Sequence, residues 1–238
     1  MSTLSPLSSQ PAAQSCAHPP ARRMLLASQS PRRRVLLSSA GVVFEVQEPG
    51  IDDAELRPGP TVNAEQFAAS LALLKAQSAW RRHARHSAQP ATLVVGADTI
   101  VVKDGRMIGK PLDAADAVRI IRLLQGGSHQ VVTGVALLDT VTGSRDVFVD
   151  KARVALGPLT AAQIDDYVAS GQWQGKAGGY NLFERQTAGW PITVQGDQTA
   201  VVGLPMQKLL PRLARYGLQP AGPTSPLSTP PAPVTPAA

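Results

Sequence analysis

The stretch that decides the fold is MLLASQSPRRRVLLSSAGVVFEV, residues 24–46. Its first four residues are apolar, and three polar residues then precede Pro31. Proline suits the first position of a helix, because its φ is already helical and its missing N–H needs no partner there. We therefore predict a strand over 24–27, a helix over 31–40 and a second strand over 42–46.

Beyond this stretch, helices with polar caps alternate with Val-rich strands. The expected helices follow the caps Asn63, Asp113 and Thr160 and include 205–216, and the expected strands are 92–103, 131–138, 147–156 and 200–202. The long helix after Asn63 should bury Phe67, Leu71, Leu74, Ala76 and Trp80. Residues 171–198 hold six glycines and little periodicity, which favours a functional loop over a packed element. The pattern predicts an α/β protein with a mixed, twisted sheet and flanking helices.

Charge and proline divide the chain into three parts. Its 23 basic and 17 acidic residues all lie within 21–218, whereas 11 of its 21 prolines lie in 1–20 and 219–238. Ends of this composition bury too little apolar area to offset the entropy of ordering them. We therefore predict a disordered leader over 1–21, one folding unit over 22–218 and a disordered proline-rich tail over 219–238.

Composition also excludes several classes of protein. Apolar runs reach only about eight residues, too few to span a membrane, and residues 1–30 lack the apolar stretch of a secretory signal. A single cysteine, Cys16, cannot form an internal disulfide, which favours the reducing cytoplasm. Five arginines and no acid lie within 22–44, while the rest of the chain is nearly neutral. This indicates a local anion site and no nucleic-acid partner, which would need charge spread along a face.

The turn SQSPRR at 28–33 is the sharpest candidate for chemistry. A helix start offers free N–H groups and a positive dipole end, to which Ser28 and Ser30 add hydroxyls. Arg32 and Arg33 add fixed donors that bind phosphate oxygens in pairs. The alternative is a capped helix whose arginines are merely solvated.

A second candidate is Asp98, which ends an apolar strand in VVGADT. A carboxylate there needs a cation, a metal or a water to activate, although it could also simply cap the next turn. Three lysines stand near such elements, namely Lys75, Lys110 and Lys176, and each alone is a surface lysine as readily as a ligand. The acidic loop with Asp53 could hold Mg²⁺ beside a phosphate or could simply be solvated.

Five segments in this order resemble the Maf family: LASQSPRR at 26–33, GADT at 96–99, GKP at 109–111, GKAGGY at 175–180 and VGLP at 202–205. The resemblance covers about residues 24–216. It implies an α/β fold with a deep nucleotide-binding cleft between two lobes, often as a homodimer. It also implies a pyrophosphatase that cuts nucleoside triphosphates to monophosphate and pyrophosphate with a divalent cation, Mg²⁺ or Mn²⁺.

The resemblance also assigns roles. Asp98 matches the family's proton acceptor. Asp98 and Asp53, which stands at an acidic position of the family, are the implied metal ligands. Arg32 and Thr99 match positions of substrate selection. The basic pocket of the family falls on Arg33, Lys75, Lys110 and Lys176. GKAGGY resembles the branch that acts on dTTP and UTP, with modified nucleotides as further substrates. The longer segment at 181–198 departs from the family, and its Gln186 is matched to the glutamine that contacts the base.

A nucleotide-binding regulatory protein linked to cell division, without turnover, is the alternative function. The sequence favours the enzyme, because a carboxylate at Asp98 repels an anion and a pure phosphate binder would do better with Asn.

Overall fold

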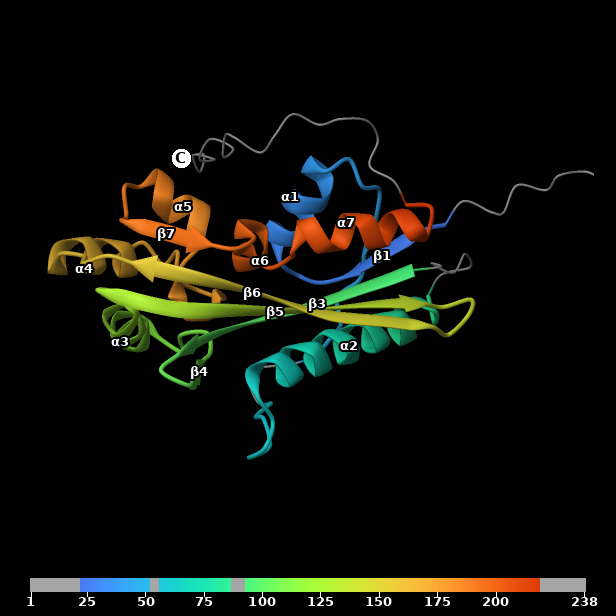
Figure 1. The fold of residues 1–238 in the computed structure, drawn as a ribbon, viewed down its shortest axis with the longest axis horizontal. Helices are drawn as coiled ribbons and strands as arrows, with labels where there is room; N and C mark the ends of the chain where they lie inside the picture. The colour runs from blue at the N-terminus through green and yellow to red at the C-terminus, as the bar shows by residue number, and fades with distance from the viewer. Residues whose placement is uncertain (1–21, 52–55, 87–92, 219–238) are drawn as a thin grey trace, which may run out of the picture.

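The computed structural model describes residues 22–51, 56–86 and 93–218, which form one mixed sheet with helices on both faces (Figure 1). The strands are β1 (Met24–Ala27), β2 (Glu45–Val46), β3 (Leu93–Lys103), β4 (Arg106–Ile108), β5 (Gly127–Asp139), β6 (Arg145–Leu156) and β7 (Ile192–Gln195). Their spatial order is β2-β1-β3-β5-β6-β7, and β4 pairs with β3. β1 runs parallel to β2 and β3, whereas the other pairs are antiparallel. The predicted mixed α/β sheet is confirmed.

Several of the helices begin after a polar residue whose side chain caps them. The helices are α1 (Pro31–Ser39), α2 (Ala64–His83), α3 (Ala114–Leu124), α4 (Ala161–Ala169), the 3₁₀ turn η1 (Ala177–Gly179), α5 (Leu182–Thr187), α6 (Gln198–Val202) and α7 (Met206–Arg215). The side chains of Asn63, Asp113 and Thr160 each accept the backbone N–H three residues on, as predicted. Within the described residues, none of these helices combines the length and apolar character that crossing a membrane requires.

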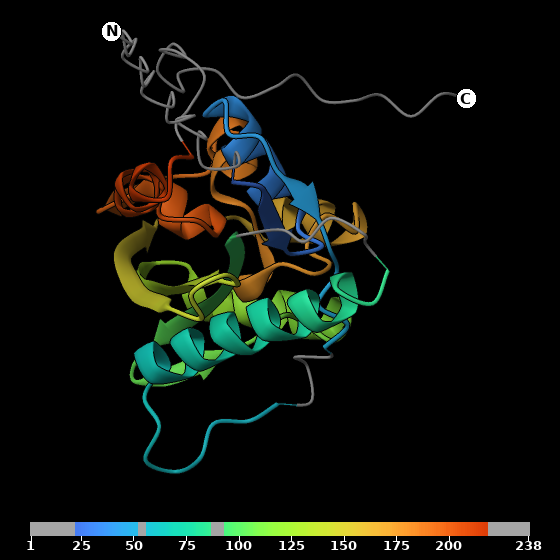
Figure 2. The ribbon, with the colours of Figure 1, turned by 90° about the vertical axis from the view of Figure 1, so that its right-hand side faces the viewer.

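Helix α2 covers one face of the sheet (Figure 2). A Cβ atom on Gly96 would lie 2.2 Å from the carbonyl oxygen of Ala72, and one on Gly134 would lie 2.5 Å from that of Ala68. Only glycine therefore allows the backbone of α2 to approach the sheet this closely. Leu74 falls outside the buried stripe of α2 and is 42% exposed, so its predicted burial is wrong.

The opposite face carries the larger core, with Leu26 of β1, Val95 of β3 and Leu137 of β5 packed under the remaining helices. In Figure 1, α3, α4, α5 and β7 gather around one end of the long strands, and β1 and α7 lie at the other. The long strands β5 and β6 run through both groups.

Two predicted strands are corrected by the structure. The strand expected over 42–46 is limited to Glu45–Val46, because only these residues pair with β1. Residues 200–202 belong to helix α6, not to a strand. Asp197 caps that helix by accepting the N–H of Thr199, and Gly203, at φ 125°, ends it after five residues.

Residues 171–198 are packed, contrary to the expected loop. They contain η1, α5 and β7, and they bury the rings of Trp173, Tyr180 and Trp190. Asn181 caps α5 by accepting the N–H of Glu184 at 3.1 Å. The helices and the strand in this segment are short and separated by glycines, so none is long enough to show a hydrophobic period in the sequence.

Candidate functional site

The candidate site lies at a stretch of β3 where one edge of the strand is not paired with another described strand. β1 pairs with Leu93–Gly96 and β4 with Val101–Lys103, while β5 occupies the other edge through Val102. Within the described part of the chain, residues 97–100 therefore pair with β5 only. Asp98 and Thr99 stand in this opening, and because they are consecutive in a strand their side chains point to opposite faces.

On the α2 face, Lys75 donates from Nζ to Oδ1 of Asp98 at 2.6 Å. Both side chains are buried, and the close seating of α2 on Gly96 and Gly134 brings the lysine within reach. The ammonium compensates a carboxylate that would otherwise be costly to bury and holds it in one orientation. The predicted proton acceptor is therefore preorganised.

On the other face, the guanidinium of Arg33 is buried and joins three elements. Its Nε donates to the carbonyl of Gly203 at 2.8 Å, and its terminal nitrogens donate to Oγ of Ser28 at 3.3 Å and Oγ1 of Thr99 at 3.2 Å. Ser28 also accepts the backbone N–H of Ser30 at 3.1 Å. The alternative that this arginine is merely solvated is wrong.

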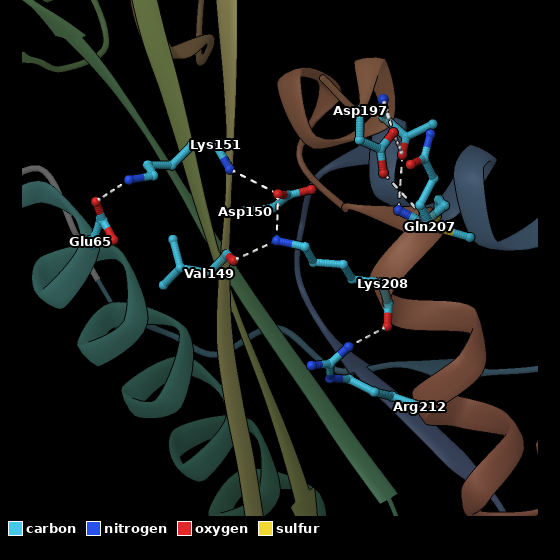
Figure 3. Close-up of polar contacts among 10 residues, drawn as sticks. Glu65, Val149, Asp150, Lys151, Asp197, Gln207, Lys208 and Arg212 are labelled. Carbon is cyan, nitrogen blue, oxygen red and sulfur yellow. Dashed lines mark hydrogen bonds and ion pairs between the residues drawn. The ribbon is translucent and has the colours of Figure 1, made fainter. Parts of the chain in front are cut away.

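Thr133 extends this network toward α6. Its hydroxyl lies 2.9 Å from that of Thr99 and donates to the carbonyl of Ala200 at 2.8 Å. Asp197 fixes the junction of α6 and α7 by accepting the N–H of Thr199 at 2.8 Å and that of Gln207 at 3.1 Å (Figure 3). The carbonyls of Ala200 and Gly203 are thereby held where Thr133 and Arg33 donate to them.

Figure 3 also shows ion pairs that join both layers to β6. Lys208 of α7 reaches Asp150 at 2.7 Å, and Lys151 reaches Glu65 of α2 at 2.7 Å. The Lys208, Lys151 and Glu65 side chains are about half exposed, so each pair contributes at most about 1 kcal/mol.

A cavity of about 50 Å³ opens on the Thr99 face. Its polar lining comes from Arg32, Thr99, His129, Lys176, Tyr180 and Asn181, and five aliphatic side chains complete the wall. Elements far apart in sequence meet here: α1, β3, β5, the η1 segment and α6.

The charged wall of the cavity is partly neutralised. Lys176 forms a hydrogen-bonded ion pair with Glu184. Burial lowers the pKa of Arg32 and of Lys176, and the carboxylate of Glu184 opposes both shifts. Tyr167 stands behind this wall, donating to the carbonyl of Gly179 at 2.9 Å.

Two more predicted site residues, Gln186 and Lys110, do not line the cavity. Gln186 is not among the lining residues, and its Nε2 donates to the carbonyl of Ile192 at 3.3 Å. Lys110 is exposed after β4, and the backbone N–H of Gly178 donates to Gly109 at 3.2 Å, which brings the two Gly-Lys segments together.

Sequence reasoning missed His129, Thr133, Tyr180, Asn181 and Glu184. Alternation along β5 places residues 129, 131 and 133 on one face of the sheet, and this pattern could have identified His129 and Thr133. The others needed the three-dimensional structure.

A metal has limited support from the described residues, where no three His, Cys, Asp or Glu side chains form a cluster. Asp53, one predicted ligand, lies outside the described residues. Asp98 supplies a carboxylate at the opening of β3, and Mg²⁺ in nucleotide sites commonly uses one or two carboxylates with substrate phosphates and water. Of the two predicted ligands, the described residues thus include Asp98 alone, and its Oδ1 already accepts from Lys75.

Comparison with known proteins matches residues 23–216 to the family described as Maf-like protein. The dTTP/UTP pyrophosphatase of Pelotomaculum thermopropionicum is 37% identical over 196 residues, covering 82% of this chain and 97% of the relative. That of Salinibacter ruber is 39% identical over 188 residues, covering 78% and 87%. Among solved structures, the Staphylococcus aureus Ham1 protein aligns with a TM-score of 0.36 at 13% identity, covering 57% of this chain and 72% of that chain.

Proposed function

Because this chain belongs to the family of Maf-like proteins, we propose that it hydrolyses nucleoside triphosphates to monophosphate and pyrophosphate, preferring dTTP and UTP. The two relatives described above are named for these substrates. The observation that carries the proposal is the buried Lys75–Asp98 pair at the edge of β3, with basic side chains beside the neighbouring Thr99 on the opposite face.

The basic residues supply positioning and charge neutralisation. The turn at 28–31 leads into α1, whose first turn offers N–H groups to phosphate oxygens, and Arg33 holds that turn against Thr99. Arg32 and Lys176 face the neighbouring cavity, and Lys110 follows β4 close to the same segment. Phosphoanhydride hydrolysis needs such placement more than covalent chemistry.

Asp98 is the group that we assign as proton acceptor for the attacking water. Its carboxylate is held by Lys75 and lies at the opening between β1 and β4. A residue whose only task was to bind an anion would not carry negative charge there, so the carboxylate favours turnover over a nucleotide-sensing role.

We assign the divalent cation, Mg²⁺ or Mn²⁺, to Asp98 and, outside the described residues, Asp53. When bound, it would neutralise charge on the phosphates. We also propose the cytoplasm as the site of the reaction, because the chain has a single cysteine. A homodimer remains a prediction that light scattering on the purified protein tests.

The test measures pyrophosphate release from all common nucleoside triphosphates and from modified ones. Asp98→Asn should retain the fold and nucleotide binding while kcat falls by about 10²-fold or more. Asp165→Asn, an exposed carboxylate on α4, is the matched control and should behave as wild type. Near-normal turnover of Asp98→Asn contradicts the assignment, and nucleotide binding without pyrophosphate release by the wild type supports the regulatory alternative.

A further inference from the structure

The cavity contains a histidine that the proposed reaction does not use. Thr99 pairs with Thr133 and Val101 with Val131, so these side chains share one face of the sheet, and His129 continues that face along β5. His129 is 3% exposed and lines the cavity. Its Nε2 lies 2.9 Å from the hydroxyl of Tyr180, and within the described residues its buried Nδ1 has no hydrogen-bond partner.

The protonation state of this pair follows from burial. Burial, together with the charge of Lys103, lowers the pKa of His129 to about 4, so the imidazole is neutral at pH 7 with one N–H. Burial also raises the pKa of Tyr180, which therefore keeps its phenolic proton. The imidazole proton and the phenolic proton are therefore distributed over three atoms, namely Nδ1 and Nε2 of His129 and the hydroxyl oxygen of Tyr180.

Counting unsatisfied groups decides where the protons lie. If Tyr180 donates to Nε2, the proton on Nδ1 of His129 is the one group left without a partner. If Nε2 donates instead, both the phenolic proton and the Nδ1 lone pair lack partners. A buried unsatisfied group is costly, so the first arrangement is favoured. His129, a lining residue of the cavity, therefore carries its proton on the buried Nδ1, and within the described residues that N–H has no acceptor.

Apart from the hydroxyl of Thr99, which accepts from Arg33, the other polar groups that line the cavity offer donors. Arg32 and Lys176 carry no acceptors, and the amide oxygen of Asn181 is occupied by the N–H of Glu184, which leaves its NH₂ group. Glu184 already compensates the charge of Lys176, so a neutral ring in the cavity meets no unpaired lysine. Aliphatic side chains together with hydrogen-bond donors suit a flat ring that bears carbonyl oxygens.

We propose that this cavity takes the pyrimidine base and that the Nδ1–H of His129, positioned by Tyr180, donates to a carbonyl that uracil and thymine have and cytosine lacks. This inference rests on the proposed nucleotide substrate and extends it to the choice among pyrimidines. Cytosine carries an amino group at C4, whose N–H would face the N–H of His129. The fixed donor therefore selects UTP and dTTP over CTP by at least about tenfold in kcat/KM.

The test compares kcat/KM for UTP and CTP in three variants. His129→Phe retains a ring but removes the donor, and the UTP/CTP ratio should fall toward unity. Tyr180→Phe leaves Nε2 without its donor and releases the imidazole to change tautomer, so the UTP/CTP ratio should fall although the imidazole itself is retained. Tyr167→Phe is the matched control, because its hydroxyl donates to Gly179 and not to His129, and its ratio should remain that of wild type.

Calorimetric binding of UMP and CMP separates this inference from the proposed function. UMP should bind at least about tenfold more tightly than CMP in the wild type and equally in His129→Phe, whether or not any triphosphate is hydrolysed. If no nucleotide is hydrolysed but this binding pattern holds, the proposed function fails and the base site stands. If the UTP/CTP or UMP/CMP ratio is unity in the wild type, or unmoved in Tyr180→Phe, the role of the pair is overturned. Near-UV circular dichroism establishes whether each variant is folded. If His129→Phe does not fold, the UTP/CTP ratio of Tyr180→Phe decides whether the inference holds.

Discussion

Lowering the pH from 7 to 5 should destabilise this protein through His129. The pKa of the imidazole is about 4 in the folded protein, below its usual 6.5. Between these values the unfolded chain binds a proton that the folded protein does not, so stability falls as the pH falls and is fully present only above about 6.5. Between the usual pKa of 6.5 and pH 5 there are about 1.5 pH units, so the free energy of unfolding falls by about 2 kcal/mol.

Urea unfolding at pH 7, 6 and 5 measures this effect in wild type and His129→Phe. The free energy of unfolding should fall about 2 kcal/mol further in wild type than in the variant, because other groups titrate alike in both. Val131→Ala, at a neighbouring cavity position, lowers stability without removing an imidazole and should keep the wild-type dependence on pH. Parallel curves for wild type and His129→Phe would refute a buried neutral imidazole.

Three further predictions concern stability and activity. Gly134→Ala should lower the free energy of unfolding by about 3 kcal/mol in urea, because its Cβ would lie 2.5 Å from the backbone of α2, whereas Gly109→Ala meets nothing within 4 Å and should cost far less. Arg33→Lys keeps the charge but loses the planar donors to Ser28, Thr99 and Gly203, so both stability and kcat/KM should fall; wild-type values for both would contradict the network. A chain of residues 22–218 should keep the Tm and activity of the full chain, because the composition of the two ends is unsuited to a core, and a drop of several degrees would mean that an end docks.

Local chemistry could be predicted from the sequence where neighbours along the chain decide it. Pro31 and the cap Asn63 start helices through contacts within one turn, and both helices form as expected. The failures occur where local signals are short. Residues 200–202 are Val-rich and resemble a strand, yet the cap at Asp197 and the turn at Gly203 make them helical.

The sequence by itself determined which residue types are present for phosphate chemistry: the turn at 28–33 and the carboxylate at Asp98. Only the tertiary structure decided how they are shared between two faces of β3, with Lys75 meeting Asp98 on one and Arg33 meeting Thr99 on the other. The physical reason is strand pairing over long sequence separations. Register, set by whole strands and by the glycines under α2, fixes which side chains meet, and no local pattern encodes it.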